Sequence, residues 1–234
     1  MKNKSIVILT GAGISQESGI KTFRDSNGLW ENHSLEDVAT PQGFAANPEL
    51  VYAFYNARRK QLLSTEVKAN PAHLALAELE KNWQGNFLLV TQNVDDLHER
   101  AGNKKILHMH GELLKMRCLQ RGEVTTITGD LTSKNRCTCC KTSSPLRPHI
   151  VWFGEMPLAM STIQKALYNC DIFISIGTSG QVYPAAGFVQ ITKSTCLKVE
   201  INLDPTDVTA SFDQKITGLA TKTVPTYVKK LLNQ

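Results

Sequence analysis

No apolar run in this 234-residue chain approaches the roughly 18 residues that a membrane-spanning helix requires, so we expect no transmembrane segment. The apolar stretch at residues 6–9 is too short for a signal peptide. Clustered positive charge is also lacking, because the formal net charge of +5 comes from Lys and Arg residues spread along the chain. We therefore expect no dedicated nucleic-acid site and only a mild preference for acidic partners.

Signs of a repeat array, a disordered chain or a disulfide framework are absent as well. There is no internal repeat and no low-complexity segment, and with 41% hydrophobic and 20% charged residues the composition is that of an ordinary globular protein. The length allows one substantial core, or a large domain with a small insertion. Without a signal for export, the six cysteines are expected in the reducing cytoplasm.

Four of the cysteines crowd into a short central segment, which favours a metal site over disulfides. A structural zinc ion is commonly held by two Cys-x-x-Cys pairs. The second pair, Cys137 and Cys140, is complete, but Arg121 stands where the partner of Cys118 would be. The candidate ligands are thus Cys118, Cys137 and Cys140, with Cys139, another side chain or water as the fourth. The alternative is a metal-free knuckle held by hydrogen bonds.

Short apolar runs alternate with helical patterns, which is typical of an α/β fold with a parallel sheet. The runs at residues 5–9, 87–90, 171–176 and 197–201 predict buried strands, and each is followed by glycine or small polar residues. In an open α/β sheet, ligands bind at the carboxyl ends of the strands. One nucleotide pocket explains these four strand ends better than four coincidences.

A glycine turn follows the first of these strands. Gly11 and Gly13 precede a helix start, an arrangement that brings backbone N–H groups close to a phosphate. The dinucleotide fingerprint would need a third glycine where Gln16 stands, so the signal is weak and the alternative is an ordinary tight turn. An arginine and two aromatic residues in the loop at residues 22–30 favour a flap over a nucleotide.

The central part of the chain brings polar side chains to two neighbouring strand ends. Gln92, Asn93 and Asp95 follow one apolar run, and His110 ends the next run, residues 106–109. Together these side chains are suited to acid–base chemistry beside a polar pocket. The alternative is a helix-capping asparagine with a satisfied core histidine.

A helix opened by Asn47 and Pro48 carries an arginine on its apolar stripe. Tyr55 and Arg58, three residues apart, can meet on the surface of this helix. Burying a lone guanidinium is costly, so Arg58 needs a carboxylate. A ligand carboxylate gripped in bidentate fashion beside the Tyr55 hydroxyl would meet that need. The alternatives are a protein carboxylate or a side chain that reaches water.

The motifs of this sequence, in their order, resemble those of the sirtuins, NAD-dependent protein-lysine deacylases, and most closely the bacterial CobB type. The resemblance runs nearly from end to end. It is carried by residues 11–15, 19–20, 23–24, 91–95, 108–111, 151–155, 177–179 and 202. It implies an α/β fold in which a smaller domain of helical and zinc-binding modules is inserted into a Rossmann-like parallel sheet domain. The active site would lie in the cleft between them.

The resemblance also implies a division of the chain, which would form one catalytic unit over residues 1–234. The Rossmann-like domain would comprise approximately residues 1–27, 71–112 and 154–234, and the smaller domain residues 28–70 (helical) and 113–153 (zinc). Because the first strand begins almost at the N-terminus, we expect no leading extension of the kind that many relatives carry. We expect a cytoplasmic monomer.

NAD would be the co-substrate, and one structural zinc ion would be bound. The residues implied to bind NAD are Gly11, Ala12, Gly13, Ile14, Ser15, Gly19, Ile20, Thr22, Phe23, Arg24, Trp30, Gln92, Asn93, Val94, Asp95, Gly177, Thr178, Ser179, Asn202, Leu203, Asp204 and Ala220. The partner would be the acylated lysine of a protein, added as an extra strand. Its implied contacts are Val151, Trp152, Phe153, Gly154, Tyr55 and Arg58.

The reaction implied by the resemblance is acyl transfer from lysine to ADP-ribose, with His110 and Asn93 as catalytic residues. The acyl oxygen would attack the ribose carbon that bears nicotinamide, and nicotinamide would leave. His110, a general base that suits this task as a neutral imidazole, would take a proton from a ribose hydroxyl. The products would be free lysine, nicotinamide and O-acyl-ADP-ribose. Tyr55 and Arg58 match a Tyr-x-x-Arg pair that marks members accepting succinyl- and malonyl-lysine, so we predict desuccinylase as well as deacetylase activity.

Other functions fit the sequence less well. A conventional NAD-dependent dehydrogenase should carry a glycine where Gln16 stands. A zinc-ribbon nucleic-acid protein, or a catalytically silent ADP-ribose reader, would not need the set of Gln92, Asn93, Asp95 and His110. Mono-ADP-ribosyl transfer within the same family stays open.

Overall fold

In the computed structural model of this chain, residues 3–20, 29–30 and 33–233 are described. Across these residues the largest element is a six-stranded sheet whose strands all run parallel. From one edge to the other its strands are β11 (Gln214–Thr217), β10 (Leu197–Asn202), β9 (Ile172–Ile176), β1 (Ile6–Thr10), β4 (Phe87–Thr91) and β5 (Ile106–His108). This confirms the predicted Rossmann-like parallel sheet.

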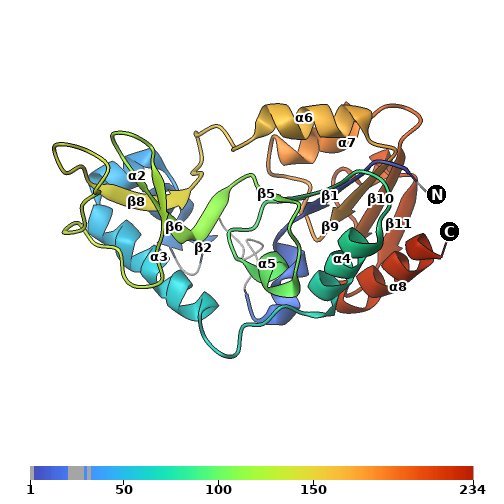
Figure 1. Cartoon of the computed structure of the whole chain (residues 1–234), viewed down its shortest axis with the longest axis horizontal. Coiled ribbons are helices and arrows are strands. Elements are labelled where there is room, and N and C mark those ends of the chain that lie inside the picture. The colour runs from blue at the N-terminus through green and yellow to red at the C-terminus, as the bar shows by residue number, and fades with distance from the viewer. Residues whose placement is uncertain (1–2, 21–28, 31–32, 234) are drawn as a thin grey trace.

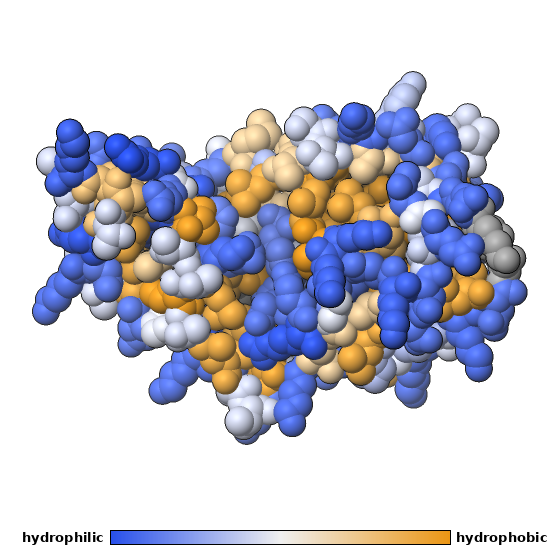
Figure 2. Space-filling model, in the orientation of Figure 1, coloured by the Kyte–Doolittle hydropathy of each residue, from blue (hydrophilic) through white to orange (hydrophobic). Residues whose placement is uncertain are grey.

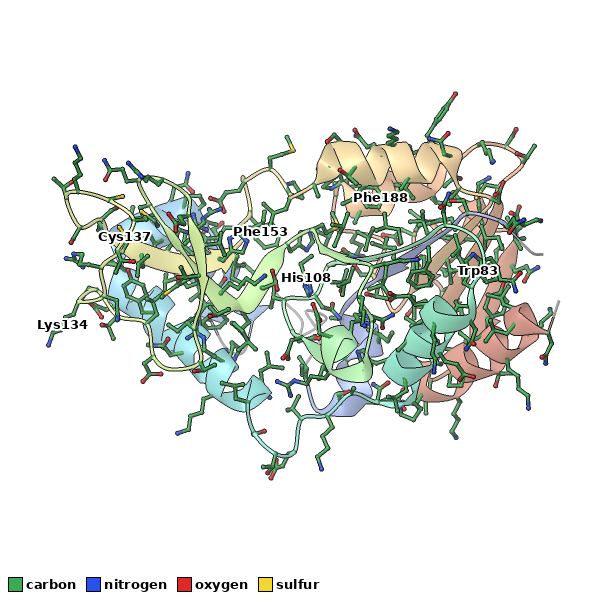
Figure 3. All side chains as sticks on the ribbon, viewed as in Figure 1. Trp83, His108, Lys134, Cys137, Phe153 and Phe188 are labelled. Carbon is green, nitrogen blue, oxygen red and sulfur yellow. The ribbon has the colours of Figure 1, made fainter. Side chains whose placement is uncertain are left out.

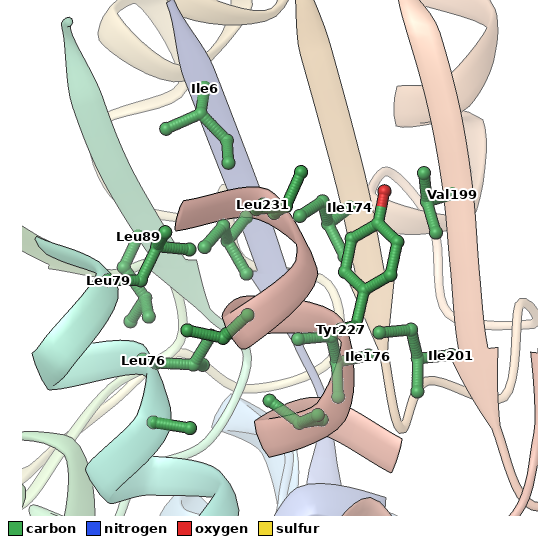
Figure 4. Packing of buried hydrophobic residues seen from close by; sticks show 14 of the residues in the cluster. Ile6, Leu76, Leu79, Leu89, Ile174, Ile176, Val199, Ile201, Tyr227 and Leu231 are labelled. Atoms are coloured by element: carbon green, nitrogen blue, oxygen red, sulfur yellow. The ribbon is translucent and has the colours of Figure 1, made fainter. Parts of the chain in front are cut away.

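Helices cover both faces of this sheet, as Figure 1 shows. One face carries α4 (Pro71–Asn82) and α8 (Ala220–Leu232), and the other carries α6 (Met160–Asn169) and α7 (Phe188–Ile191). Every residue of the central strands β1 and β9 is buried, so both faces of the sheet need an apolar cover. In Figure 4, Leu76 and Leu79 of α4 and Tyr227 of α8 pack on the strands to form one of the two cores.

The remaining described elements form a second, smaller body, drawn at the left of Figure 1. Its centre is an antiparallel sheet in the order β7-β6-β8, with α3 packed against β6 and β8. The elements are β2 (Leu29–Trp30), β3 (His33–Ser34), α1 (Leu35–Val38), α2 (Pro41–Ala46), α3 (Pro48–Leu62), β6 (Gly111–Cys118), β7 (Val124–Thr126) and β8 (Leu146–Ile150). Short helices complete the chain: α5 (Leu97–Ala101), η1 (Ala12–Ile14), η2 (Gln16–Ser18), η3 (Ala185–Gly187) and η4 (Thr209–Ser211).

The predicted helix start at Asn47 and Pro48 is confirmed, and Thr40 with Pro41 opens α2 in the same way. Thr40 accepts a hydrogen bond from Gly43 N–H at the start of α2, and Asn47 accepts one from Leu50 N–H at the start of α3. Each cap satisfies a backbone donor that the first helical turn leaves open. Asn47 and the proline that follows it fix where α3 begins, and hence which side chains its buried face presents.

Two local expectations need correction. The apolar residues 150–153 predict a strand, but β8 ends at Ile150, because Val151 N–H bonds to the His110 carbonyl and Phe153 N–H to the Ala39 carbonyl rather than to a neighbouring strand. Pro225 predicts the start of the last helix, because proline is favoured at the first helical position, but the helix begins at Ala220 and Pro225 lies inside it. The burial of Val224 and the apolar face behind it outweighs the one backbone hydrogen bond that the proline removes.

Membrane-spanning helices are not found in the described part of the chain, since none of its helices combines the necessary length with enough apolar residues.

Candidate active site

One cavity of about 550 Å³ opens at the carboxyl ends of β1, β4, β9 and β10 and extends to the smaller body. Its size is that of a site for a small molecule or cofactor. Many residues that the sequence nominated line it. They are Gly11, Ala12, Gly13, Ser15, Ile20, Tyr55, Arg58, Gln92, Asn93, Val94, Asp95, His110, Val151, Trp152, Phe153, Gly154, Gly177, Thr178, Ser179, Asn202, Leu203 and Ala220. Figure 2 shows apolar residues gathered near the middle of this face, where the two bodies meet.

Other nominated residues are not placed in the cavity wall. Ile14 is buried in the core beneath the parallel sheet, and Gly19 caps η2 in the left-handed conformation, with φ of 87°. Asp204 follows the β10 end without lining the cavity. Thr22, Phe23 and Arg24 lie outside the described residues, and of Trp30 only the backbone, in β2, is described.

Gly11 and Gly13 lie so close to Gly177 that neither position has room for a side chain. A Cβ on Gly11 would lie 2.8 Å from the carbonyl oxygen of Gly177, and one on Gly13 would lie 2.8 Å from the Gly177 Cα. Gly13 N–H also donates to the Gly177 carbonyl at 2.9 Å. The turns after β1 and β9 are therefore pressed together, which draws two strand ends into one cavity floor.

Ser15 is the centre of a buried hydrogen-bond network on that floor. Its hydroxyl donates to Asp95 Oδ2 at 3.0 Å and accepts from Asn93 Nδ2 at 3.1 Å. His73 Nδ1 accepts from Asn70 N–H, so the proton is on Nε2, which lies 3.4 Å from the Ser15 hydroxyl as a donor. This arrangement turns the amide nitrogen of Asn93 toward Ser15 and its oxygen away.

The carboxyl group of Asp95 is buried in the cavity wall. Burial raises the pKa of Asp95 to about 6, against the hydrogen bonds from Leu97 N–H and Ser15, which lower it. The group is thus held by donors that prefer its ionised form, in surroundings that prefer its neutral form. A carboxyl in this state can change its proton occupancy near neutral pH.

His110 lines the cavity where the chain passes from β5 of the parallel sheet to β6 of the smaller body. Its Nδ1 is 3.0 Å from the carbonyl oxygen of Gln92, an acceptor, so Nδ1 must carry the proton. Burial lowers the pKa of His110, and the bond to Gln92 only partly opposes this. The imidazole is therefore neutral at pH 7, with an unprotonated Nε2 that can accept a proton.

His108, two residues earlier, is in the opposite state. Its Nε2 lies 2.6 Å from Glu99 Oε1 and its Nδ1 lies 3.3 Å from the carbonyl oxygen of Asn93. Both partners are acceptors, so both ring nitrogens must donate and the ring is an imidazolium. Burial acts to lower the pKa of His108, but the hydrogen bond to Glu99 and its charge raise it overall. The His108–Glu99 pair thus supports the backbone of Asn93. Figure 3 shows His108 between the two bodies.

Tyr55 and Arg58 bring α3 to the other end of the cavity. Tyr55 is fully buried and burial raises its pKa, so its hydroxyl stays protonated. The Arg58 guanidinium lies over the Phe54 ring, 4.6 Å from the ring centroid, with its Nε and Nη1 shielded from water. This arrangement places a charged group and a hydroxyl at the end of the cavity away from the sheet.

Several cavity residues were missed by the sequence reasoning. They include Gln16, Glu17, Leu35, Gln61, Leu113, Glu155, Pro157, Gln181, Val182, Tyr183, Gly218 and Leu219. Gln61 could have been found, because it lies one turn after Arg58 on the same helix. Gly218 and Leu219 follow β11, a strand whose residues are not fully buried and whose pattern therefore gave no apolar run.

The cysteine segment closes on itself at the far end of the smaller body, where Figure 3 labels Cys137. The Sγ atoms of Cys118, Cys137, Cys139 and Cys140 all lie within 4.8 Å of one another. Backbone N–H of Arg121 lies 3.5 Å from Cys118 Sγ and lowers the pKa of Cys118 to about 6, which favours a thiolate. Four converging sulfur atoms fit a structural zinc ion, and Cys139 lies where it could supply the fourth ligand that the sequence left open.

Comparison with known proteins identifies the family. Residues 11–184 match the Sir2 family, and this chain belongs to that family. A Salmonella typhimurium protein named NAD-dependent protein deacylase is 58% identical over 233 residues, which cover 99% of this chain and 85% of that protein. A Pasteurella multocida protein of the same name is 59% identical over 232 residues, covering 99% of both chains.

Solved structures of the family share the fold described above. A crystal structure of a Sir2 homologue in complex with NAD superposes with a TM-score of 0.86 at 39% identity, covering 97% of this chain and 90% of that one. A Sir2 structure described as a complex with a p53 peptide and NAD⁺ superposes with a TM-score of 0.78 at 30% identity, covering 97% and 92%.

Proposed function

We propose that this chain is an NAD-dependent protein-lysine deacylase that removes both acetyl and succinyl groups. The observation that carries the proposal is the single cavity that runs from the strand ends, past His110, to Tyr55 and Arg58. Membership of the Sir2 family and the shared name of its relatives support the general activity. The cavity end formed by α3 supports the choice of acyl group.

NAD would bind at the strand-end part of the cavity. The close contact between the turns at Gly11 and Gly177 leaves backbone groups, rather than side chains, facing the space where a pyrophosphate would lie. Asn202 donates to the Thr178 carbonyl at 2.6 Å, which holds the β9 and β10 ends together for the adenosine half. When bound, NAD supplies a ribose carbon with nicotinamide as leaving group. The protein side chains position the reacting groups and take the proton of a ribose hydroxyl.

His110 would act as the general base, and Asn93 would bind and orient. The unprotonated Nε2 of His110 can take a proton from a ribose hydroxyl, and the proton on Nδ1 stays bound to the Gln92 carbonyl throughout. Asn93 is held from two sides: its side-chain amide nitrogen bonds to Ser15, and its backbone carbonyl oxygen bonds to His108. Its amide oxygen can therefore accept a hydrogen bond without rearrangement.

The acyl end of the cavity would recognise a carboxylate. An arginine that is largely withdrawn from water stabilises an anion better than an exposed one, because the local dielectric is low. The neutral Tyr55 hydroxyl can donate beside it. The shorter acetyl group would occupy only the inner part of the same space and use neither group, so both substrates are accommodated.

We also propose the division of the chain into a Rossmann-like domain and a smaller domain with the boundaries expected from the sequence. The parallel sheet and the antiparallel sheet, each with its own helices and core, support it. One zinc ion held by the four cysteines would stabilise the smaller domain. The monomeric state, the cytoplasmic location and the lack of a nucleic-acid site stay predictions.

The test is nicotinamide release from NAD with acetyl-lysine and succinyl-lysine peptides in parallel, for the unchanged protein and for Arg58→Met. We expect release that requires a peptide, with no NADH formed. Arg58→Met should lower kcat/KM for the succinyl peptide by about 10- to 100-fold more than for the acetyl peptide, the effect of losing a charged hydrogen bond.

Arg121→Met, at an exposed position in the cysteine segment, is the matched control and should leave the ratio of the two substrates unchanged. NADH formation would instead support a dehydrogenase, and release without peptide would support another use of NAD. An equal loss of both activities in Arg58→Met would make this arginine structural.

A further inference from the structure

Trp152 makes a contact with Tyr55 that its role as an apolar cavity residue does not require. It is 2% exposed and lies just after β8, in the segment that leads to α6. Its indole Nε1–H donates to the Tyr55 hydroxyl oxygen at 2.9 Å. The two rings belong to segments 97 residues apart, so this bond ties the segment after β8 to α3.

The direction of this hydrogen bond restricts what the Tyr55 hydroxyl can do. An indole N–H can only donate, so the phenol oxygen is the acceptor. Its own O–H bond then points away from the indole, and the hydroxyl meets a ligand as a donor. A donor suits a carboxylate, which when ionised can only accept.

We propose that Trp152 is a positioning residue for acyl-group specificity: its indole N–H fixes the Tyr55 hydroxyl as a donor toward the acyl group and so favours acyl groups that end in a carboxylate. This inference rests on the proposed function, because it concerns the same acyl end of the cavity. It differs from that proposal in placing part of the selectivity in a residue that touches the substrate's acid group only through Tyr55.

The indole itself is held in place by a charged pair. The Arg147 guanidinium lies 3.3 Å from the centroid of the Trp152 ring, and its two terminal nitrogens bond to Glu155 at 2.7 and 2.9 Å. Glu155 Oε2 also accepts from the backbone N–H of Trp152 at 2.9 Å. A cation over the ring face draws electron density from the indole, which strengthens its N–H as a donor.

The neutral state of Tyr55 is compatible with this role. Burial raises its pKa, so the proton that it donates is retained at physiological pH. The ring is also fixed on its other side, since it packs edge-on against Phe54 with centroids 5.2 Å apart. The Phe54 contact and the indole N–H bond hold the ring and its oxygen from two sides, so we infer that the donor direction is set before a ligand arrives.

The test is a double-mutant cycle with Trp152→Phe, Tyr55→Phe and the double variant. Phenylalanine keeps an aromatic ring at position 152 and removes only the N–H and part of the ring system. We expect Trp152→Phe to lower the succinyl-to-acetyl ratio of kcat/KM by about tenfold, mainly through KM for the succinyl peptide. The double variant should show no further fall in this ratio than Tyr55→Phe alone, since Trp152 acts through Tyr55.

Tyr52→Phe is the matched control. It removes another buried hydrogen bond made by a tyrosine hydroxyl of α3, the one donated to the Leu146 carbonyl at 2.6 Å. Tyr52 does not line the cavity, so the ratio should stay unchanged. An unchanged ratio in Trp152→Phe, or ratio changes that add in the double variant, would overturn the inference and leave the proposed function standing. Loss of both activities in equal measure would show a merely structural tryptophan. A wild-type protein without desuccinylase activity would overturn both proposals.

Discussion

At the scale of single residues, the protonation state of His110 follows from one neighbour and from burial, neither of which the sequence shows. The Gln92 carbonyl fixes the proton on Nδ1, and burial keeps the ring neutral by lowering its pKa. His108, only two residues away, is charged because Glu99 and a backbone carbonyl face it instead. The sequence alone shows two similar histidines, and their partners separate a proton acceptor from a structural cation.

We predict that His110→Ala abolishes deacylation, with a loss of at least roughly 10²–10⁴-fold in kcat, while NAD binding is largely retained. The group works when neutral and its pKa is lowered, so the acid limb of kcat/KM against pH should lie below the ordinary histidine value of 6.5. Nicotinamide release and calorimetric NAD titration measure the two effects. His149→Gln, on β8 and outside the cavity, should change neither, and substantial turnover by His110→Ala would rule out its role as the base.

The glycines of the first turn show how the sequence can reveal only part of the reason for a residue. Both glycines were expected to let a phosphate approach the backbone, and both line the cavity. The space that their side chains would need, however, is filled by Gly177, in the turn after the distant strand β9. A contact between distant turns leaves no local pattern, so the sequence could predict the turn but not the neighbour that requires it.

At the scale of elements, the buried strands and the capped helices were predicted and the edge of the sheet was not. A fully buried strand such as β9 produces a continuous apolar run, and Asn-Pro pairs mark helix starts. β11 is an edge strand with alternating exposure, so its residues do not stand out. Residues 151–153 show the converse failure, because this apolar run pairs with no strand: only Trp152 of the three is buried, and the backbone N–H groups of Val151 and Phe153 bond to His110 and Ala39.

The cysteine segment is an element whose stability should depend on metal. We predict about one zinc ion per chain, bound by all four cysteines, with a lowered melting temperature after removal by a chelator. Cys139→Ser should retain much less zinc after dialysis against the same chelator, as measured by atomic absorption. Cys170→Ser, at a buried position in the core above the parallel sheet, is the control for loss of a cysteine. Full retention by Cys139→Ser would return the fourth position to water or another side chain.

At the scale of the whole molecule, the sequence predicted two bodies with a site between them but not how one cavity joins their ends. The nucleotide-side residues follow strand ends and were found as a group. The acyl-side residues come from α3 and from the segment after β8, and they meet through the Trp152–Tyr55 bond and the Arg147–Glu155 pair. Such contacts depend on how the two bodies pack, and a sequence pattern records only the elements within each body.

The whole molecule should also lose stability in mild acid because of two histidines buried beside the parallel sheet. His73 and His98 are 0% and 1% exposed, and their ring centroids are 4.8 Å apart. Burial lowers the pKa of His73 to about 4 and that of His98 well below 6.5. The unfolded chain therefore binds protons below pH 6.5 that the folded chain does not, and stability falls as the pH drops. The raised pKa of Asp95 opposes this between about 6 and 3.8 by one proton.

We predict that in His98→Gln the unfolded chain binds one proton fewer in acid than the unfolded wild type. This lowers the pH slope of the free energy of unfolding by about 1.4 kcal/mol per pH unit once the unfolded histidine is fully charged. Between pH 6.5 and 5 the free energy of unfolding of the variant should fall by on the order of 2 kcal/mol less than that of the wild type, even if the variant is less stable at pH 7. Urea unfolding at several pH values measures this slope. Asn82→Gln, at an exposed position on α4, removes no titratable group and should keep the wild-type slope. Parallel slopes for wild type and His98→Gln would show that His98 is already protonated in the folded protein, so that the hydrogen bond between its Nε2 and the Thr10 hydroxyl, 3.0 Å long, is made by an imidazolium.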